Sequence, residues 1–263
     1  MAITHMDTAF RLDGKTAIVT GGNRGIGFGI STAFAQAGAN VAILCRNEET
    51  AIAAVNELSS KYSGKFKFYK CDITDMALCK QAVDAVVEDF GGIDILVNNG
   101  GIAVGGATLD MDEELEMYFR CIDVDLNGTM RMSYLVGKHM AAAGKGGKVI
   151  NISSNSGAII NKPQFFTPYH VAKAGVNHMT RSLANEWSQY GINVNAIAPG
   201  YTHSGLSDGM NDEIYNFLAS KIPLGRFGDA IEVGALAVYL ASPASDMVTG
   251  VVVTIDGGYS IPV

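Results

Sequence analysis

Short apolar segments alternate with longer amphipathic segments along almost the whole chain, and this alternation restricts the fold more than any other feature. The segments between the apolar runs have helical spacing, except in 201–228, which is irregular. Strands that alternate with helices form βαβ units and a parallel sheet. The chain is therefore predicted to be α/β, a single Rossmann-type doubly wound parallel sheet of seven strands with helices on both faces. The predicted strands are 15–20, 40–45, 65–71, 94–99, 147–153, 192–200 and 251–258.

No linker, repeat or low-complexity tract divides the 263 residues, so we expect one domain over 1–263. Within it, 1–12 is expected to be an N-terminal extension and 201–228 a substrate loop. Two long helices are expected, at about 112–139 and 167–189. Hydrophobic residues make up 48% of the chain, which is enough for a large core.

Charge and composition exclude several classes of function. The net charge is −7 and no long basic block is present, which argues against nucleic-acid binding. No apolar run has transmembrane length, and the N-terminus lacks the apolar core of a secretory signal, so we expect a cytoplasmic protein without membrane contact. The four cysteines and five histidines show no metal-ligand spacing, and we expect no metal and reduced thiols.

A glycine-rich stretch, TGGNRGIG at 20–27, follows the first predicted strand and opens the first helix. Its glycines Gly21, Gly25 and Gly27 are spaced GxxxGxG. Glycine allows a sharp turn and a close approach of the backbone to a pyrophosphate, while the helix start directs free N–H groups at the phosphates. At this place the pattern indicates a dinucleotide site, and a glycine-rich turn without a ligand is the alternative.

The end of the second predicted strand indicates which dinucleotide binds. Sites for NAD usually carry an acidic residue there, which binds the ribose 2′-hydroxyl. Here Cys45 occupies that place and Arg46 follows it, while Arg24 lies within the glycine loop. Two guanidinium groups match a 2′-phosphate as bidentate donors. We therefore expect NADP(H), although either arginine alone would be an ordinary surface charge.

The stretch YHVAK places Tyr169 and Lys173 four residues apart. On a helix this spacing puts both side chains on one face. An ammonium beside a phenol stabilises the phenolate, so that the phenol becomes a usable acid or base. Taken alone, the same spacing also fits an exposed aromatic and a solvated lysine.

Several motifs in this order resemble the classical short-chain dehydrogenase/reductase family over nearly the whole chain, from Lys15 to about Tyr259. The motifs are TGGNRGIG (20–27), CDITD (71–75), NNGG (98–101, with Gly100 in place of an alanine), YHVAK (169–173), APGY (198–201) and TGVVVTIDGG (249–258). The resemblance implies an NADP(H) site formed by Gly21, Asn23, Arg24, Gly25, Ile26, Gly27, Arg46, Asp72, Ile73, Asn98, Tyr169, Lys173, Pro199, Gly200, Thr202 and Ser204.

The same resemblance implies the chemistry. Tyr169 would give a proton to a carbonyl oxygen in reduction, or take one in oxidation. Lys173 would hold the nicotinamide ribose and favour the phenolate. A serine should hydrogen-bond the same oxygen as charge develops, and among Ser153, Ser154 and Ser156 the family placement selects Ser154. Ser156 is the runner-up and could instead touch the substrate.

Two positions depart from the family pattern. Many members carry an asparagine in the long helix, where it helps to hold a water in a proton relay, and here CIDVDLNGTM places Asp125 at that position. Asn127 lies two residues on, on a different helical face. Asp125 is kept as a relay residue, with a capping or structural role as the alternative. Ser204 stands where a threonine is common, and its hydroxyl could do the same work.

Finer features resemble the sugar-alcohol branch of the family, the NADPH-dependent sorbose reductases and mannitol 2-dehydrogenases. They are the stretch SSNSGAIINKPQFFTPY, the motifs IDVDLNG and YKCDITD, and the ending DGGYSIP. That branch implies reduction of a ketose to a hexitol. A polyol needs several hydrogen bonds, and the candidate donors and acceptors are Ser156, Asn161, Gln164 and His203. Ordinary loop polarity would place the same residues there.

Alternatives from other classes remain open at this point. Phe165, Phe166, Met210 and Phe217 could line an apolar pocket, as in a reductase of 3-oxoacyl thioesters, quinones, steroids or other hydrophobic ketones. A non-catalytic NADP-binding protein is a more distant reading, because such proteins typically lose the tyrosine or the lysine. The resemblance also implies a homotetramer that pairs the two long helices and the C-terminal strands.

Overall fold

The computed structural model describes residues 5–204 and 210–261. Residues 1–4 of the expected N-terminal extension and residues 205–209 of the expected substrate loop lie outside the described ranges. The main sheet has seven parallel strands in the order β3-β2-β1-β4-β5-β6-β9. This arrangement confirms the predicted doubly wound sheet. The strands are β1 (Thr16–Thr20), β2 (Asn40–Cys45), β3 (Phe66–Lys70), β4 (Ile95–Asn98), β5 (Gly147–Ile152), β6 (Ile192–Pro199) and β9 (Val252–Ile255).

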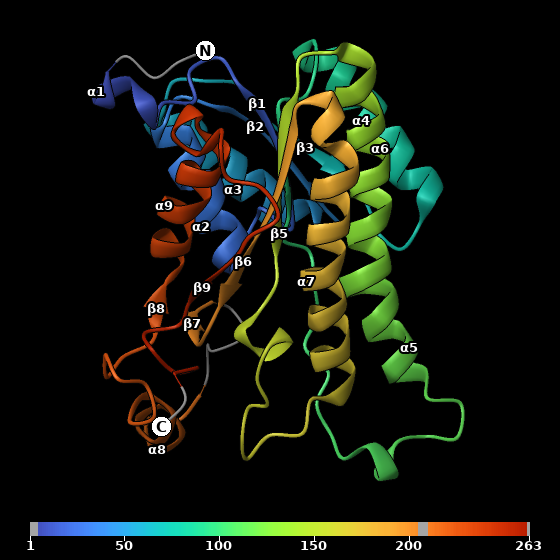
Figure 1. Ribbon diagram of the computed structural model, residues 1–263, viewed down its shortest axis with the longest axis vertical. Coiled ribbons are helices and arrows are strands. Elements are labelled where there is room, and N and C mark those ends of the chain that lie inside the picture. The colour runs from blue at the N-terminus through green and yellow to red at the C-terminus, as the bar shows by residue number, and fades with distance from the viewer. Residues whose placement is uncertain (1–4, 205–209, 262–263) are drawn as a thin grey trace.

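Helices cover both faces of the sheet (Figure 1). Each face has its own hydrophobic core, and alternate residues of β1 belong to different cores. Val19 packs in the core under the first group of helices and Ile18 in the core under the second, both groups being given below. A strand buried on both faces must be apolar at consecutive positions, which explains the continuous apolar runs. The first group is α2 (Gly25–Gln36), α3 (Glu48–Lys61) and α9 (Ala230–Ala241), and the second is α4 (Met76–Phe90), α6 (Thr129–Ala143) and α7 (Thr167–Trp187).

The long helix expected at 112–139 is divided. Helix α5 (Glu116–Ile122) passes into a π-helical turn, η2 (Asp123–Gly128), before α6 begins. The Thr129 hydroxyl donates to the Asp125 carbonyl oxygen at 2.7 Å, and Ile73 packs so closely on Gly128 that a Cβ there would lie 2.9 Å away. Wider turns of this kind often occur at functional sites. The periodicity of the sequence does not reveal the extra residue in the turn.

The irregular segment 201–228 contains structure that the sequence did not predict. Strand β7 (Thr202–His203) pairs with β8 (Gly228–Asp229), and helix α8 (Asp212–Ala219) lies between them in the chain. Apolar side chains from this segment form a third, small cluster with an aromatic rim. Its members are Leu218, Ala219, Ile222 and Phe227, with Tyr201, Met210, Tyr215 and Tyr259 packed against them. The remaining short elements are α1 (Met6–Ala9), η1 (Thr108–Asp110), η3 (Asn155–Gly157), η4 (Ser188–Tyr190) and η5 (Pro243–Ser245).

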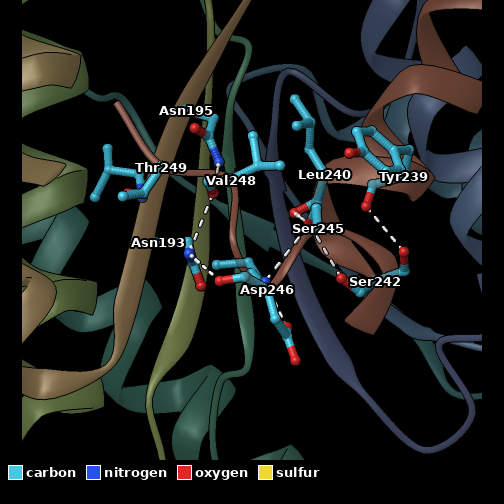
Figure 2. Close-up of polar contacts among 11 residues, drawn as sticks. Asn193, Asn195, Tyr239, Leu240, Ser242, Ser245, Asp246, Val248 and Thr249 are labelled. Carbon is cyan, nitrogen blue, oxygen red and sulfur yellow. Dashed lines mark hydrogen bonds and ion pairs between the residues drawn. The ribbon is translucent and has the colours of Figure 1, made fainter. Parts of the chain in front are cut away.

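Two asparagines of β6 fasten the loop that leads from α9 to β9 (Figure 2). The Asn195 amide donates to the Val248 carbonyl oxygen at 2.8 Å and its oxygen accepts the Val251 N–H at 3.2 Å. Asn193 donates to the carbonyl oxygens of Asp246 and Val248, both at 3.1 Å. These bonds set the register of β9 on β6. They therefore also place the turn after β9, which lies beside the loop that follows β5.

Candidate active site

The candidate catalytic side chains meet beyond the carboxyl ends of β4, β5 and β6, where parallel α/β sheets bind their ligands. Tyr169 and Lys173 come from the first turns of α7, Ser154 follows β5, and Asp125 comes from η2. A buried polar layer beneath this edge ties α7 to the sheet. Asn151 of β5 donates to Thr180 of α7 at 3.0 Å, and the Thr180 hydroxyl donates to the Val176 carbonyl oxygen.

Lys173 is buried, with only 5% of its surface exposed. Its Nζ donates to the Ile152 carbonyl oxygen at 3.0 Å, lies 3.2 Å from Oδ2 of Asp125, and stands 5.4 Å from the centre of the Tyr169 ring. Burial lowers the pKa of the ammonium, but the charge of Asp125, with Tyr169, outweighs burial and raises the pKa above its usual value. Lys173 therefore stays charged, and the predicted pairing of phenol and ammonium on one helix face is present.

Asp125 is fully buried and held on two sides. Its Oδ1 accepts the Ile102 N–H at 2.8 Å, and its Oδ2 faces Lys173. A Cβ on Gly101 would lie 3.1 Å from Oδ2, so the glycine makes room for the carboxylate. Asn127 is exposed and donates to Asp123 at 3.2 Å, away from the site. The position named by the resemblance thus holds a buried acid in direct contact with the lysine.

The three serines after β5 have different partners. The Ser153 hydroxyl donates to the Lys173 carbonyl oxygen at 3.2 Å, and the Ser156 hydroxyl donates to Oδ1 of Asn161 at 2.6 Å. Ser154 makes only local bonds, accepting the Ser156 N–H at 3.1 Å at the start of η3 and reaching Oδ1 of Asn155 at 3.4 Å. Ser154 thus has the hydroxyl least committed to distant partners, which suits the role expected for it.

The glycine loop is shaped by backbone contacts that leave no space for side chains. Gly21 and Gly25 have φ values of 63° and 51°, in the left-handed region that favours glycine. A Cβ on Gly27 would lie 2.1 Å from the Gly21 carbonyl oxygen. Helix α2 starts here with Arg24 at its N-cap and no side chain capping it, so its first N–H groups face outward from the sheet edge. An uncapped helix start behind a close-packed glycine turn fits a pyrophosphate.

The side chain of Asn98, a predicted cofactor residue, has partners within the sheet and α6. It is 3% exposed and donates to the Ser133 hydroxyl and to Oδ1 of Asn151, both at 2.9 Å, inside the buried polar layer. The next residue, Asn99, holds the glycine loop instead, since its amide donates to the carbonyl oxygens of Thr20 and Gly21 at 3.0 and 3.2 Å. Successive side chains of a strand point to opposite faces, a signal that separates the two asparagines of NNGG.

Three predicted cofactor residues, Arg24, Arg46 and Asp72, lie near the end of β2, where the 2′-phosphate is expected. Burial raises the pKa of the half-buried Cys45 thiol, and the positive charge of Arg24 opposes that rise. Arg46 lies 3.7 Å from Oδ2 of Asp72. Burial raises the pKa of Asp72, but hydrogen bonds from Thr74 and the charge of Arg46 outweigh it and lower the pKa below its usual value.

Two further predicted residues take up structural positions at this end. The Asn23 amide donates to the Thr50 hydroxyl at 2.7 Å, and so joins the glycine loop to the start of α3. Ile73 lies between Gly100 and Gly128, where Cβ atoms would be 3.1 and 2.9 Å from it. An alanine at position 100 would therefore crowd Ile73, which gives a local reason for the glycine of NNGG.

The Pro-Gly turn after β6 packs against the turn after β9. A Cβ on Gly200 would lie 2.5 Å from the Cβ of Asp256, whose Oδ2 accepts from the Asn155 amide at 3.4 Å. The hydroxyl of Thr202 donates to the Gly200 carbonyl oxygen at 3.1 Å, and Ser204 is the last residue described before 205–209. Gly200 therefore lies beside Asn155, the residue that follows Ser154.

The expected substrate residues fall into separate groups. Asn161 is 5% exposed and accepts from Ser156, and Nε2 of His170 lies 3.4 Å from the same oxygen. Gln164 accepts from the Tyr201 hydroxyl at 2.9 Å. His203 instead belongs to the aromatic cluster, with ring centres 5.8 Å from Tyr215 and 5.6 Å from Phe227. Sequence reasoning did not single out His170 or Tyr201 as substrate residues, although each lies within a predicted motif, YHVAK and APGY respectively.

Within the described ranges, no set of three or more histidine, cysteine, aspartate or glutamate side chains is arranged to hold a metal ion. Nor does any helix described there have the length and apolar character needed to cross a membrane.

Comparison with known proteins places this geometry in a family. A family profile described as enoyl-(acyl carrier protein) reductase matches residues 21–260. The chain is 40% identical over 254 residues to a sorbose reductase of Candida albicans, covering 96% of this chain and 89% of that protein. It is 40% identical over 261 residues to an NADP-dependent mannitol dehydrogenase of Alternaria alternata, covering 98% and 97%.

A solved structure agrees with these sequence matches. The crystal structure of a short-chain type dehydrogenase/reductase from Mycobacterium marinum superposes with a TM-score of 0.94 at 36% identity, covering 98% of this chain and all of that one. Fold, motif order and sequence identity over the full length agree. The chain therefore belongs to the classical short-chain dehydrogenase/reductase family of oxidoreductases.

Proposed function

We propose that the protein interconverts a ketose and a sugar alcohol with NADP(H), in the manner of a sorbose reductase or mannitol 2-dehydrogenase. The observation that carries the proposal is a polar group in which Ser156 and His170, the residue after Tyr169, both approach Oδ1 of the buried Asn161. The similarity to a sorbose reductase and to a mannitol dehydrogenase points the same way.

The residues at the glycine loop fit a dinucleotide. The close approach of Gly27 to Gly21 and the uncapped start of α2 leave backbone N–H groups for a pyrophosphate. The charge of Arg24 acts on Cys45 at the end of β2, and Arg46 is the next residue of the chain. A 2′-phosphate of NADP bound there would meet these guanidinium groups, and position 45 carries no carboxylate that would repel it. When bound, the nicotinamide supplies the hydride.

The chain's own residues would handle the proton. In reduction, the Tyr169 hydroxyl donates its proton to the carbonyl oxygen, and the Ser154 hydroxyl donates a hydrogen bond to the same oxygen as negative charge develops. The phenolate that remains is stabilised by the Lys173 ammonium, whose Nζ lies 5.4 Å from the centre of the ring. In oxidation the same groups take the hydroxyl proton in reverse.

Substrate recognition would begin with Asn161. Its Oδ1 accepts from Ser156, and within the described part of the chain its Nδ2 donates to no protein group. The orientation of the amide therefore leaves two N–H donors for substrate hydroxyl groups. A site that offers buried donors to hydroxyl groups discriminates strongly against analogues that lack them. Gln164, held by Tyr201, is the second candidate contact.

A reductase of a bulkier, apolar ketone is the second candidate. It is favoured by Phe165 and Phe217, whose side chains are 67% and 49% exposed near the same loops. Such a ketone would cover these rings and remove them from water.

The test is NADPH oxidation with a panel of carbonyl compounds: fructose, sorbose, xylulose, an acetoacetyl thioester and a hydrophobic aryl ketone. We expect turnover with the ketoses and little with the others. Turnover confined to the thioester or the aryl ketone would refute the ketose assignment while keeping the proton chemistry of Tyr169.

We also infer a homotetramer built on α5, α6 and α7. Apolar side chains that a monomer would leave in water are concentrated there: Met117, Phe119, Met130, Tyr134 and Val171. Light scattering after gel filtration should give four times the chain mass, and a monomeric mass would contradict the inference.

A further inference from the structure

The pair formed by Asp125 and Lys173 is the most deeply buried ion pair in the described part of the chain. The side chains are 0% and 6% exposed and the charged atoms are 3.2 Å apart. Burying two charges is costly unless each is well compensated. Such a pair next to the reacting groups therefore calls for a functional explanation.

The fold encloses the carboxylate of Asp125 completely. Oδ1 is occupied by the Ile102 N–H, and Oδ2 is buried with Lys173 as its single charged neighbour among the described residues. The room for Oδ2 comes from Gly101. An amide at this position would offer a neutral oxygen, whereas the carboxylate places a full negative charge against the ammonium.

Lys173 is surrounded by few other groups that titrate. They are Asp125 from η2, Tyr169 from its own helix and Cys121 from α5. Burial, together with the Asp125 charge, raises the pKa of the Cys121 thiol to about 12, so the thiol is uncharged at neutral pH. Among the described titratable groups that act on Lys173, Asp125 is therefore the only carboxylate.

We propose that Asp125 is the counter-ion of Lys173 and acts as a positioning residue: it holds the ammonium beside the Tyr169 ring and, by offsetting part of its charge, weakens the stabilisation that Lys173 gives to a Tyr169 phenolate. This role differs from the water-holding role that the resemblance implies. It rests on the proposed proton transfer by Tyr169, and it predicts that loss of the Asp125 charge lowers the pH at which alcohol oxidation reaches half of its maximal rate.

The sign of the effect follows from the charges. Lys173 stabilises the phenolate, and Asp125 opposes that stabilisation because like charges repel. Removing the Asp125 charge should therefore let the phenolate form at a lower pH. Asp125 lies 3.2 Å from an ammonium that is itself 5.4 Å from the centre of the Tyr169 ring, and for a unit charge at such a place in a partly polar interior the expected displacement is on the order of one pH unit.

The test compares Asp125→Asn with the wild type and with a matched control, Asp123→Asn. Asp123 lies in the same π-helical turn and has the same charge, but it pairs with Arg131 at 2.7 Å and does not contact Lys173. The rate of alcohol oxidation is measured against pH with the alcohol whose ketone the wild type reduces in the panel. In Asp125→Asn the half-maximal pH should fall by about one unit, and in Asp123→Asn it should stay near the wild-type value.

A readout without substrate separates this proposal from the ketose assignment. The ultraviolet titration of the Tyr169 phenolate is obtained by subtracting the spectrum of Tyr169→Phe in each background. A parallel downward displacement in Asp125→Asn supports the counter-ion role, even if ketoses fail as substrates. Coincident or upward-displaced midpoints in Asp125→Asn, with circular dichroism showing a folded protein, would overturn it.

Discussion

The two ends of the candidate active site differ in composition: one is formed by backbone atoms and the other by side chains. The proposed cofactor end consists of backbone, with glycines in the left-handed region and a helix start that no side chain caps. The backbone is packed so closely there that a Cβ on Gly27 would lie 2.1 Å from the Gly21 carbonyl oxygen. The proposed substrate end consists of side chains on loops that are held by single hydrogen bonds, such as Asn161 with Ser156 and Gln164 with Tyr201.

This difference teaches where change is tolerated. Substitutions around the glycine loop are tolerated, but a residue with a Cβ does not fit at its closest contacts, because the atoms that would clash with the Cβ are backbone atoms and cannot move aside. A loop site made of side chains can be exchanged residue by residue, which changes the substrate and leaves the fold alone. Tyr169 and Lys173 lie between the two ends, on the rigid helix α7.

The largest effect is expected at that junction. Tyr169→Phe removes the proton donor and should lower kcat by at least about a thousandfold, with NADPH affinity within a few fold of the wild type. Tyr190→Phe, which alters an exposed tyrosine on η4, should leave kcat unchanged. Steady-state kinetics and NADPH fluorescence titration measure both. Retention of most turnover in Tyr169→Phe would favour a different donor.

The second largest effect is expected from a charge reversal at Arg46, which should change the cofactor preference and still allow a dinucleotide to bind. Arg46→Asp replaces a guanidinium with a group that repels a 2′-phosphate and accepts a ribose hydroxyl. The ratio of kcat/KM for NADPH over NADH should fall by roughly a hundredfold, as expected for loss of a charged hydrogen bond and gain of repulsion. Lys80→Asp makes the same change of charge on the exposed face of α4, and an equal fall there would refute the local explanation.

Two glycine substitutions compare the ends directly. Gly27→Ala introduces a Cβ into the glycine loop and should weaken NADPH binding at least about tenfold and destabilise the fold by about 1–3 kcal/mol. Gly228→Ala, in β8, meets its nearest neighbour at 3.7 Å and should change neither. Fluorescence titration and thermal unfolding give both quantities. Equal effects at the two positions would break the distinction between a backbone end and a side-chain end.

The smallest effect is expected at the substrate end. Asn161→Ala removes a donor amide and should raise KM for the ketose about tenfold while kcat stays within about threefold, because binding and not proton transfer is lost. Asn185→Ala, at an exposed position near the end of α7, is the control. If kcat fell as strongly as kcat/KM, Asn161 would act on the transition state and the assignment to ground-state binding would be wrong.

Local pattern carried much of the prediction. Apolar runs separated by helical spacing predict the seven-stranded sheet because a strand covered on both faces must be apolar throughout. The glycine loop and the pair Tyr169 and Lys173 could be found for a similar reason, since a turn, a helix start and an i, i+4 face are all properties of a few consecutive residues.

Contacts between distant segments could not be predicted in the same way. The sequence predicted a continuous helix where a π-helical turn presents Asp125 to Lys173, and it favoured Asn98 where Asn99 holds the glycine loop. Spacing determines which side chains share a face, but the partners of a buried polar group come from elements 20 to 80 residues away, such as Asn99 with Thr20 and Ser153 with Lys173. Only packing of the whole chain brings these groups within hydrogen-bonding distance, because each must find a partner once water is removed.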